Sequence, residues 1–235
     1  MAQSAVQKRE IQDKRFAFVA MICRPTSIIV CTSEIRAAQG QLIGCEAQLL
    51  VGAVPRRQRE IIGGRVLARR AMVEMGHNPM EVGQRPNGAP IWPTGLCGSL
   101  AHSHSHVAVA LARSAQMLSV GIDIDDGRNL GAAASQVGMA EELRTIGDHP
   151  LADGIEGAAR LLFSAKEALF KCQSSLTQNE ALGLLDVQLM ACSTGCLVAA
   201  VSAHVESSVA EIVARTHIII EIIQGITVAV AWVEV

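Results

Sequence analysis

Two carboxylates stand two positions apart in the run SVGIDID, residues 119–125. The run is short and apolar apart from Asp123 and Asp125, which is typical of a strand. Side chains two residues apart point to the same face of a strand, so these carboxylates should lie side by side. The other face is apolar and would anchor the strand in a core: Val120, Ile122 and Ile124.

A second run with reactive side chains, FSAKEALFK, lies within a helix that we expect over residues 157–174. Its apolar positions recur at helical spacing and form one stripe: Leu161, Ala165, Ala168, Leu169 and Cys172. Glu167 and Lys171, four residues apart, lie on a different face and point together. Two strand carboxylates and one helix carboxylate, with lysines beside them, suit a hard cation that holds a phosphate ester. Magnesium prefers oxygen ligands and completes its shell with water and phosphates.

These motifs resemble those of the 4′-phosphopantetheinyl transferases, G-(I/V)-D-x-E and (W/F)-x-x-K-E-(A/S)-x-x-K, with Glu167 placed 44 residues after Asp123. The closest likeness is to the branch typified by the enterobactin-synthase transferase component. GAPIWPTG (88–95) and GSLAHS (98–103) resemble that branch's G-A-P-x-W-P-x-G…G-S-L-(T/S)-H. The three motifs occur in the family's order and cover roughly residues 55–175. Two departures are Asp125, where the family usually has Glu, and Ala101, where many relatives have Thr or Ser.

The resemblance implies a magnesium-dependent holo-[carrier protein] synthase type of enzyme. It would move the 4′-phosphopantetheine arm of coenzyme A to a serine of an apo acyl or peptidyl carrier protein and release 3′,5′-ADP. Asp123, Asp125 and Glu167 would hold the metal. Glu167 is also the candidate general base, and Lys171 with Lys166 would bind the pyrophosphate as point charges.

The same resemblance assigns the nucleotide end of coenzyme A to a second set of residues: Arg57, Arg65, Arg85, Ser99 and His102. Two of these lie on a helix expected over residues 55–75, which begins with a proline, carries an apolar side and is followed by Gly76. Guanidinium forks match phosphate oxygens. A solvated basic face is the alternative interpretation of this arginine-rich helix, and we keep it for the other arginines.

Residues 100–111 alternate as a strand, and a regular strand would put His102, His104 and His106 on one face. Three imidazoles on one face can form part of a zinc site. The alternative is that His104 and His106 are exposed histidines at a strand end. A zinc-dependent hydrolase built on the three histidines therefore remains one rival hypothesis, and a non-catalytic coenzyme A-binding module is another.

The resemblance predicts an α+β fold of two similar, pseudo-symmetric lobes, each a small sheet with packed helices, with the active site in the cleft between them. We expect residues 1–115 to form the nucleotide-binding lobe and residues 116–235 to carry the acidic residues and the signature helix. Further strands are expected over residues 182–189, 197–203 and 216–232, the last with a hairpin turn at Gln224-Gly225.

Composition narrows the class of protein. Half of the 235 residues are hydrophobic and 18% are charged, which indicates a globular chain. A net charge of −2 argues against a general nucleic-acid binder. We recognise no signal peptide and no apolar run of membrane-spanning length, so we expect a cytoplasmic monomer with no membrane span. In that compartment the seven cysteines should be buried and reduced.

Overall fold

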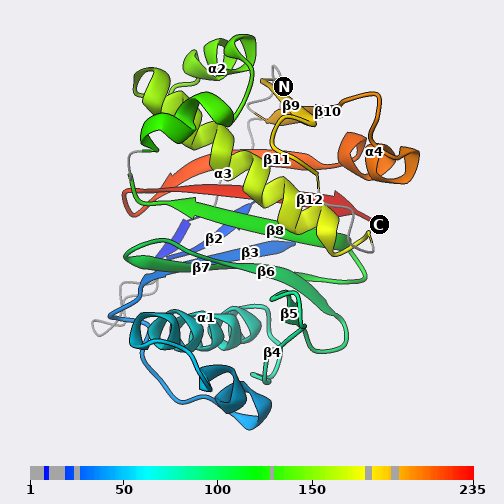
Figure 1. Ribbon diagram of the computed structural model, residues 1–235. Helices are drawn as coiled ribbons and strands as arrows, with labels where there is room; N and C mark the ends of the chain where they lie inside the picture. Colours follow the sequence, from blue (N-terminus) through cyan, green and yellow to red (C-terminus); the bar gives the residue numbers. More distant parts are fainter. Residues whose placement is uncertain (1–7, 11–18, 24–26, 128–129, 178–181, 192–195) are drawn as a thin grey trace. The chain divides into compact units, whose positions relative to one another are not determined.

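The chain divides into two compact units, Met1–Met117 and Leu118–Val235. The computed structural model describes residues 8–10, 19–23, 27–127, 130–177, 182–191 and 196–235, coloured along the chain in Figure 1. Each unit combines an antiparallel ladder of strands with a long helix. The expected α+β class is therefore confirmed.

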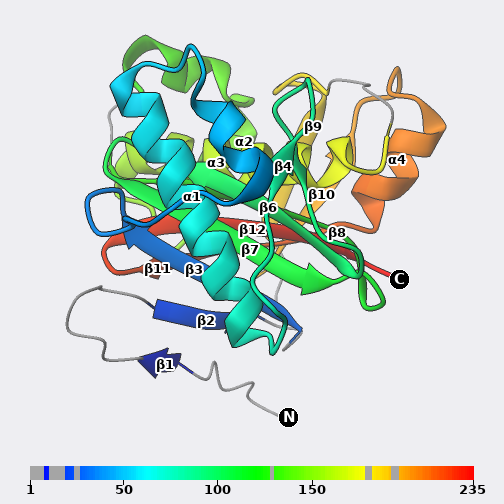
Figure 2. The ribbon, with the colours of Figure 1, turned by 90° about the horizontal axis from the view of Figure 1, so that it is seen from below.

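The first unit is built on a five-stranded sheet in the order β1-β2-β3-β7-β6, with every neighbouring pair antiparallel. Its strands are β1 (Lys8–Glu10), β2 (Val19–Cys23), β3 (Ile28–Glu34), β6 (Leu96–His102) and β7 (His106–Arg113). Helix α1 (Pro55–Glu74) lies across this sheet against β3 and β7 (Figure 2). A 3₁₀ helix, η1 (Gly44–Leu50), precedes α1, and the short pair β4 (Gly83–Gln84) and β5 (Pro90–Ile91) follows it.

Helix α1 begins and ends where the sequence predicts. Pro55 occupies its first turn, where a missing N–H costs nothing. Gly76 has φ 72° and donates its N–H to the Val73 carbonyl at 2.9 Å, while the next N–H, of His77, reaches the Met72 carbonyl at 2.8 Å. This pattern is a Schellman C-cap, which requires a left-handed residue that glycine adopts without strain.

The second unit has a five-stranded sheet in the order β8-β12-β11-β10-β9. Its strands are β8 (Met117–Asp125), β9 (Val187–Ala191), β10 (Leu197–Val201), β11 (His217–Ile223) and β12 (Ile226–Glu234). Its helices are η2 (Gly131–Gln136), α2 (Ala140–Gly147), α3 (Gly154–Ser174) and α4 (Ser207–Ala214). Helix α3, the signature helix, packs on β11 and β12 through the apolar stripe expected from its sequence.

Two segments differ from the expected strands. Residues 100–111 are not one strand but the end of β6 and most of β7, joined by a turn at residues 103–105. The strand expected over 182–189 begins later, as β9 at Val187. The hairpin expected over 216–232 is confirmed as β11-β12, with φ 52° at Gln224 and φ 81° at Gly225. Two successive positive φ angles define the tight turn that matches the twist of a hairpin. No helix in the described ranges is long and apolar enough to cross a membrane.

Candidate active site

Asp123 on β8 and Lys171 on α3 form the central contact of the second unit's polar cluster. Lys171 donates to Asp123 Oδ1 at 2.7 Å and to the Ile122 carbonyl at 3.1 Å. The Asp123 side chain is 15% exposed and the Lys171 side chain 31% exposed. The strand motif and the helix motif, 48 residues apart in sequence, therefore meet through a charged pair that solvent still reaches.

The glycine of GIDID makes this contact possible. A Cβ on Gly121 would lie 1.9 Å from the Ala168 carbonyl oxygen and 2.7 Å from the Cys172 nitrogen, both in the α3 backbone. Only glycine allows the helix and the strand to approach so closely. Ser119, two residues earlier on the same face, donates to the Cys172 carbonyl at 2.7 Å.

Asp125 shares this face but has a different partner. Its Oδ2 lies 3.2 Å from Arg160 Nε on α3, and its Oδ1 accepts the Gly127 N–H at 3.2 Å. Asp123 and Asp125 therefore both point toward α3, as strand alternation predicts. Each is paired with a different cation of that helix.

Glu167 lies one helical turn before Lys171 and is partly buried. Burial raises its pKa above the ordinary value; the Lys171 ammonium opposes this shift and the Asp123 carboxylate adds to it. The oxygen donors of Asp123 and Glu167 fit a hard cation such as magnesium. Nowhere in the described ranges, however, do three His, Cys, Asp or Glu side chains gather as a ready metal site. The expected three-carboxylate set is not preassembled.

Lys166 differs from the expected pyrophosphate ligand. Its side chain is 0% exposed, and Nζ donates to the Val137 and Leu184 carbonyls at 3.0 and 2.7 Å. The third acceptor is the carboxylate of Glu142, itself 1% exposed, at 3.0 Å. The geometry assigns Lys166 to the interior, where its ammonium is already surrounded by acceptors, and removes it from the substrate-facing set.

In the first unit, Arg57 and His102 come together around one carboxylate. Glu60 Oε2 lies 3.1 Å from Arg57 Nη1 and 3.2 Å from His102 Nε2, while Oε1 accepts from Arg56 at 3.0 Å. Burial disfavours ionised Glu60, but hydrogen bonds from the two arginines and the nearby His102 outweigh it and lower its pKa. The Arg57 and His102 side chains stay 43% and 45% exposed. The exposed parts of these two side chains can bind an anion from solvent.

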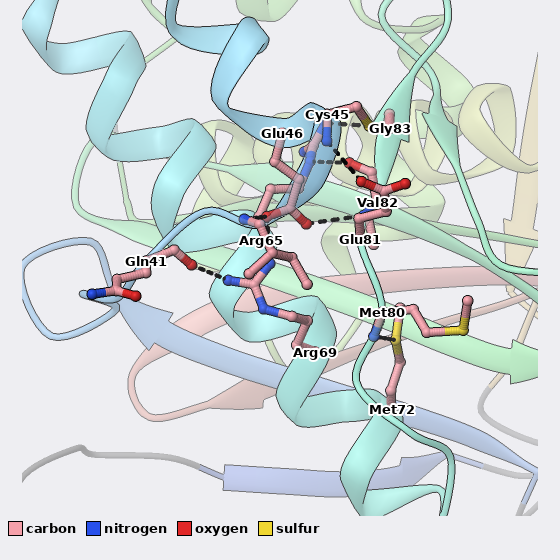
Figure 3. Close-up of polar contacts among 11 residues, drawn as sticks. Gln41, Cys45, Glu46, Arg65, Arg69, Met72, Met80, Glu81, Val82 and Gly83 are labelled. Carbon is pink, nitrogen blue, oxygen red and sulfur yellow. Dashed lines mark hydrogen bonds and ion pairs between the residues drawn. The ribbon is translucent and has the colours of Figure 1, made fainter.

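Arg65, expected beside Arg57, instead lies in the interior. It is 5% exposed and donates to the Val82 and Gly83 carbonyls at 2.8 and 3.4 Å. Figure 3 shows this contact within a network in which Glu46, 0% exposed, accepts from Arg69 and from the Val82 N–H. Burial lowers the pKa of Arg65. Its observed role is to fix the strand that follows α1, not to present a guanidinium to solvent.

The other residues of the expected nucleotide set are placed separately. Arg85 is exposed between β4 and β5, and Ser99 is buried within β6. Trp92 donates its indole N–H to the Gly98 carbonyl at 2.7 Å and packs on the core of the first unit. Trp92 is therefore a packing residue of the first unit.

The histidine stripe expected for a zinc site does not form. His102 ends β6, His104 lies in the turn, and His106 begins β7, so the regular strand that would align them is absent. His106 Nδ1 lies 2.8 Å from the Ser105 hydroxyl. The turn arises because Ser103 caps it twice, through its own N–H to the His106 carbonyl and through its hydroxyl from the His106 N–H.

Sequence reasoning missed three polar residues that organise these clusters: Glu60, Glu142 and Arg160. Glu60 follows Arg56 and Arg57 at ion-pair spacing on α1, which is a usable signal. Arg160 precedes Glu167 by seven residues, two helical turns, and so shares its side of α3. Glu142 carried no such signal, because its partner lies 24 residues away.

Residues 45–112 match the family described as the 4′-phosphopantetheinyl transferase N-terminal domain. The chain is 36% identical over 133 residues to the 4′-phosphopantetheinyl transferase Npt of Nocardia iowensis, covering 56% of this chain and 59% of the relative. It is 35% identical over 136 residues to Svp of Streptomyces mobaraensis (57% and 55%), and 33% identical over 139 residues to PptT of Mycobacterium tuberculosis (57% and 59%). Both carry the same enzyme name.

The chain thus spans less than two thirds of the length of the curated relatives it matches. The matches confirm the family resemblance that the three motifs carry. They do not single out the enterobactin-synthase branch.

Proposed function

We propose that this protein is a 4′-phosphopantetheinyl transferase. It would move the phosphopantetheine arm of coenzyme A to a serine hydroxyl of an apo acyl or peptidyl carrier protein, with magnesium, and release 3′,5′-ADP. The observation that carries the proposal is the Asp123–Lys171 contact at 2.7 Å, with Glu167 one turn before Lys171 on the same helix. This arrangement joins two motifs that each resemble the family's.

The reaction makes one bond and breaks one. The serine Oγ attacks the β-phosphorus, the bond from that phosphorus to the bridging oxygen breaks, and its electron pair leaves with 3′,5′-ADP. Glu167 would accept the serine proton as the general base. Asp123 and Glu167 would hold a magnesium ion, which when bound supplies neutralisation of the pyrophosphate charge. Lys171 would hold a pyrophosphate oxygen as a point charge.

Arg57 and His102 would bind phosphates of the nucleotide half. Both are exposed and share Glu60, so an incoming phosphate meets two donors whose positions are already fixed. Hydrogen bonds between charged groups contribute about 1.5–3 kcal/mol each. Arg85, exposed in the loop that precedes β5, is kept as a third candidate, and buried Ser99 as a fourth.

The two rival hypotheses are weaker. The zinc hydrolase needs three aligned imidazoles, and the turn at residues 103–105 separates them. A non-catalytic coenzyme A module would have no use for the Glu167 carboxylate beside the Asp123–Lys171 pair. The transferase accounts for both clusters.

The direct test is to incubate the protein with coenzyme A, magnesium and a panel of apo carrier proteins and to weigh the carriers. We expect a mass increase of one phosphopantetheine arm on at least one carrier. Asp123→Ala and Glu167→Ala should each lower the rate by about a hundredfold or more. Glu141→Ala on α2, where the side chain is 74% exposed, is the matched carboxylate control and should keep the parent rate.

An unmodified panel would contradict the transferase, provided that the protein binds coenzyme A. Near-parental turnover by folded Asp123→Ala in saturating magnesium would contradict the role of the acidic residues.

A further inference from the structure

Both carboxylate oxygens of Asp125 are engaged by donors of the protein itself. Arg160 Nε lies 3.2 Å from Oδ2, and the Gly127 N–H donates to Oδ1 at 3.2 Å. The second contact closes a turn in which an aspartate accepts from the backbone two residues ahead. The first joins the end of β8 to the N-terminal part of α3.

The Asp125–Arg160 pair is partly buried, to about the same extent as the Asp123–Lys171 pair. The Asp125 side chain is 18% exposed and the Arg160 side chain 26% exposed. Partly buried pairs are screened less by salt than exposed ones. For comparison, the Glu141–Arg144 pair on α2 has atoms 3.8 Å apart and side chains 74% and 77% exposed.

Asp125 therefore differs from Asp123, although both lie on one strand face. The partner of Asp123 is Lys171, a flexible point charge that can follow a phosphate. The partner of Asp125 is Arg160, whose planar guanidinium presents its donors in a fixed geometry. A magnesium ion placed on Asp125 would have to displace Arg160 or stand directly beside its charge.

We propose that Asp125 is not a direct ligand of the metal but the fixed anionic partner of Arg160, and that Arg160 is a positioning residue of the site. The inference rests on the proposed function. It leaves Asp123 and Glu167 as the two carboxylates that face the ion. It also gives a physical reason for the shorter side chain at this position: an aspartate already bonded to Arg160 and to its own turn does not need to reach the metal.

The test is a titration of the full-length protein with Mn²⁺ alone, in which free Mn²⁺ is measured by its electron paramagnetic resonance signal. Removing the neutral pair together, in Asp125→Asn/Arg160→Gln, should leave Mn²⁺ affinity within about threefold of the parent, less than the tenfold that corresponds to 1.4 kcal/mol. Asp123→Asn should weaken it about tenfold or more. The matched control is Glu141→Gln/Arg144→Gln, which removes an exposed neutral pair.

The single variant Arg160→Gln gives a second readout. It uncovers the charge of Asp125 near the ion, so Mn²⁺ affinity should rise about threefold or more, while Arg160→Lys, which keeps the charge, should match the parent. If the Asp125→Asn/Arg160→Gln double variant does not fold, Asp125→Asn/Arg160→Met takes its place, with the same expected affinity.

A tenfold loss in the folded double variant overturns the inference and makes Asp125 a ligand. A loss rather than a gain in Arg160→Gln overturns the role of Arg160 as the cation that neutralises Asp125. If Asp123→Asn binds Mn²⁺ as the parent does, it is the metal role within the proposed function that fails. The two failures are therefore distinguishable.

Discussion

Lys166 and Glu142 form an ion pair that has no contact with solvent: Nζ lies 3.0 Å from the carboxylate, and the side chains are 0% and 1% exposed. Glu142 also accepts the Leu189 N–H of β9 at 2.7 Å. One buried pair thus ties α3 to α2 and to the edge of the sheet. The lysine in the middle of the signature helix is part of the architecture that holds Glu167 in place.

Removing one member of this pair should destabilise the second unit strongly. Lys166→Met leaves Glu142 buried without its cation, and such losses cost about 3–5 kcal/mol. We expect a drop of that size in the free energy of unfolding measured in urea. Lys171→Met, at a side chain 31% exposed, is the matched control and should change stability by less than about 1 kcal/mol. Parental stability of Lys166→Met together with weaker coenzyme A binding would restore Lys166 to the substrate site.

Arg57 and Arg65 lie on one helix, but truncating them should have different effects, on coenzyme A affinity for one and on stability for the other. Arg57→Ala removes an exposed guanidinium and should weaken coenzyme A binding about ten- to a hundredfold with little effect on stability. Arg65→Ala should instead destabilise the first unit, because it leaves the Val82 and Gly83 carbonyls without their donor. Calorimetric titration and urea unfolding of both variants check this. Equal losses of affinity in the two variants, with unchanged stability, would contradict the assignment.

Substitutions of the histidines in the β6-β7 hairpin can distinguish the transferase from a zinc enzyme. His102→Ala should lower coenzyme A affinity, because its imidazole shares Glu60 with Arg57 and lies 45% exposed. His104→Ala, in the turn, should stay within about threefold of the parent in affinity. Activity should survive zinc chelation once magnesium is resupplied. The hydrolase is the better hypothesis if two results are found together. His104→Ala would lower coenzyme A affinity as much as His102→Ala does, and zinc alone would restore activity to the metal-free protein.

The raised pKa of the Cys97 thiol should lower the free energy of unfolding in alkaline solution. Burial raises its pKa to about 11 from 9.0, so between these values the unfolded chain releases the proton while the folded chain keeps it. The unfolded state then binds fewer protons, and the free energy of unfolding falls as pH rises, by up to about 1.4 kcal/mol per pH unit for one thiol.

The test compares Cys97→Ala with the parent by urea unfolding at pH 8, 9 and 10. The variant should lose less stability across this range. Cys31, whose thiol pKa burial also raises, is present in both proteins and cancels in the comparison. Identical pH slopes for the two proteins would show that Cys97 ionises in the folded state as readily as in the unfolded chain.

Local sequence patterns were enough to predict much of the secondary structure. The bounds of α1, the stripe of α3 and the turn at Gln224-Gly225 follow from periodicity and turn chemistry, which act over a few residues. The shared face of Asp123 and Asp125 follows from strand alternation alone. Sequence by itself therefore determined the α+β class, the two motif-bearing elements and the family resemblance.

Only the tertiary structure decided which charged side chains are buried in the interior and which lie near solvent. Lys166 and Lys171 lie five residues apart on one helix, yet one is buried against Glu142 and the other meets Asp123 near solvent. Arg57 and Arg65 likewise lie on one helix, yet Arg57 is exposed and Arg65 is buried. The physical reason is that desolvation and ion pairing depend on partners brought in from distant segments, whereas periodicity reports only the face a side chain occupies.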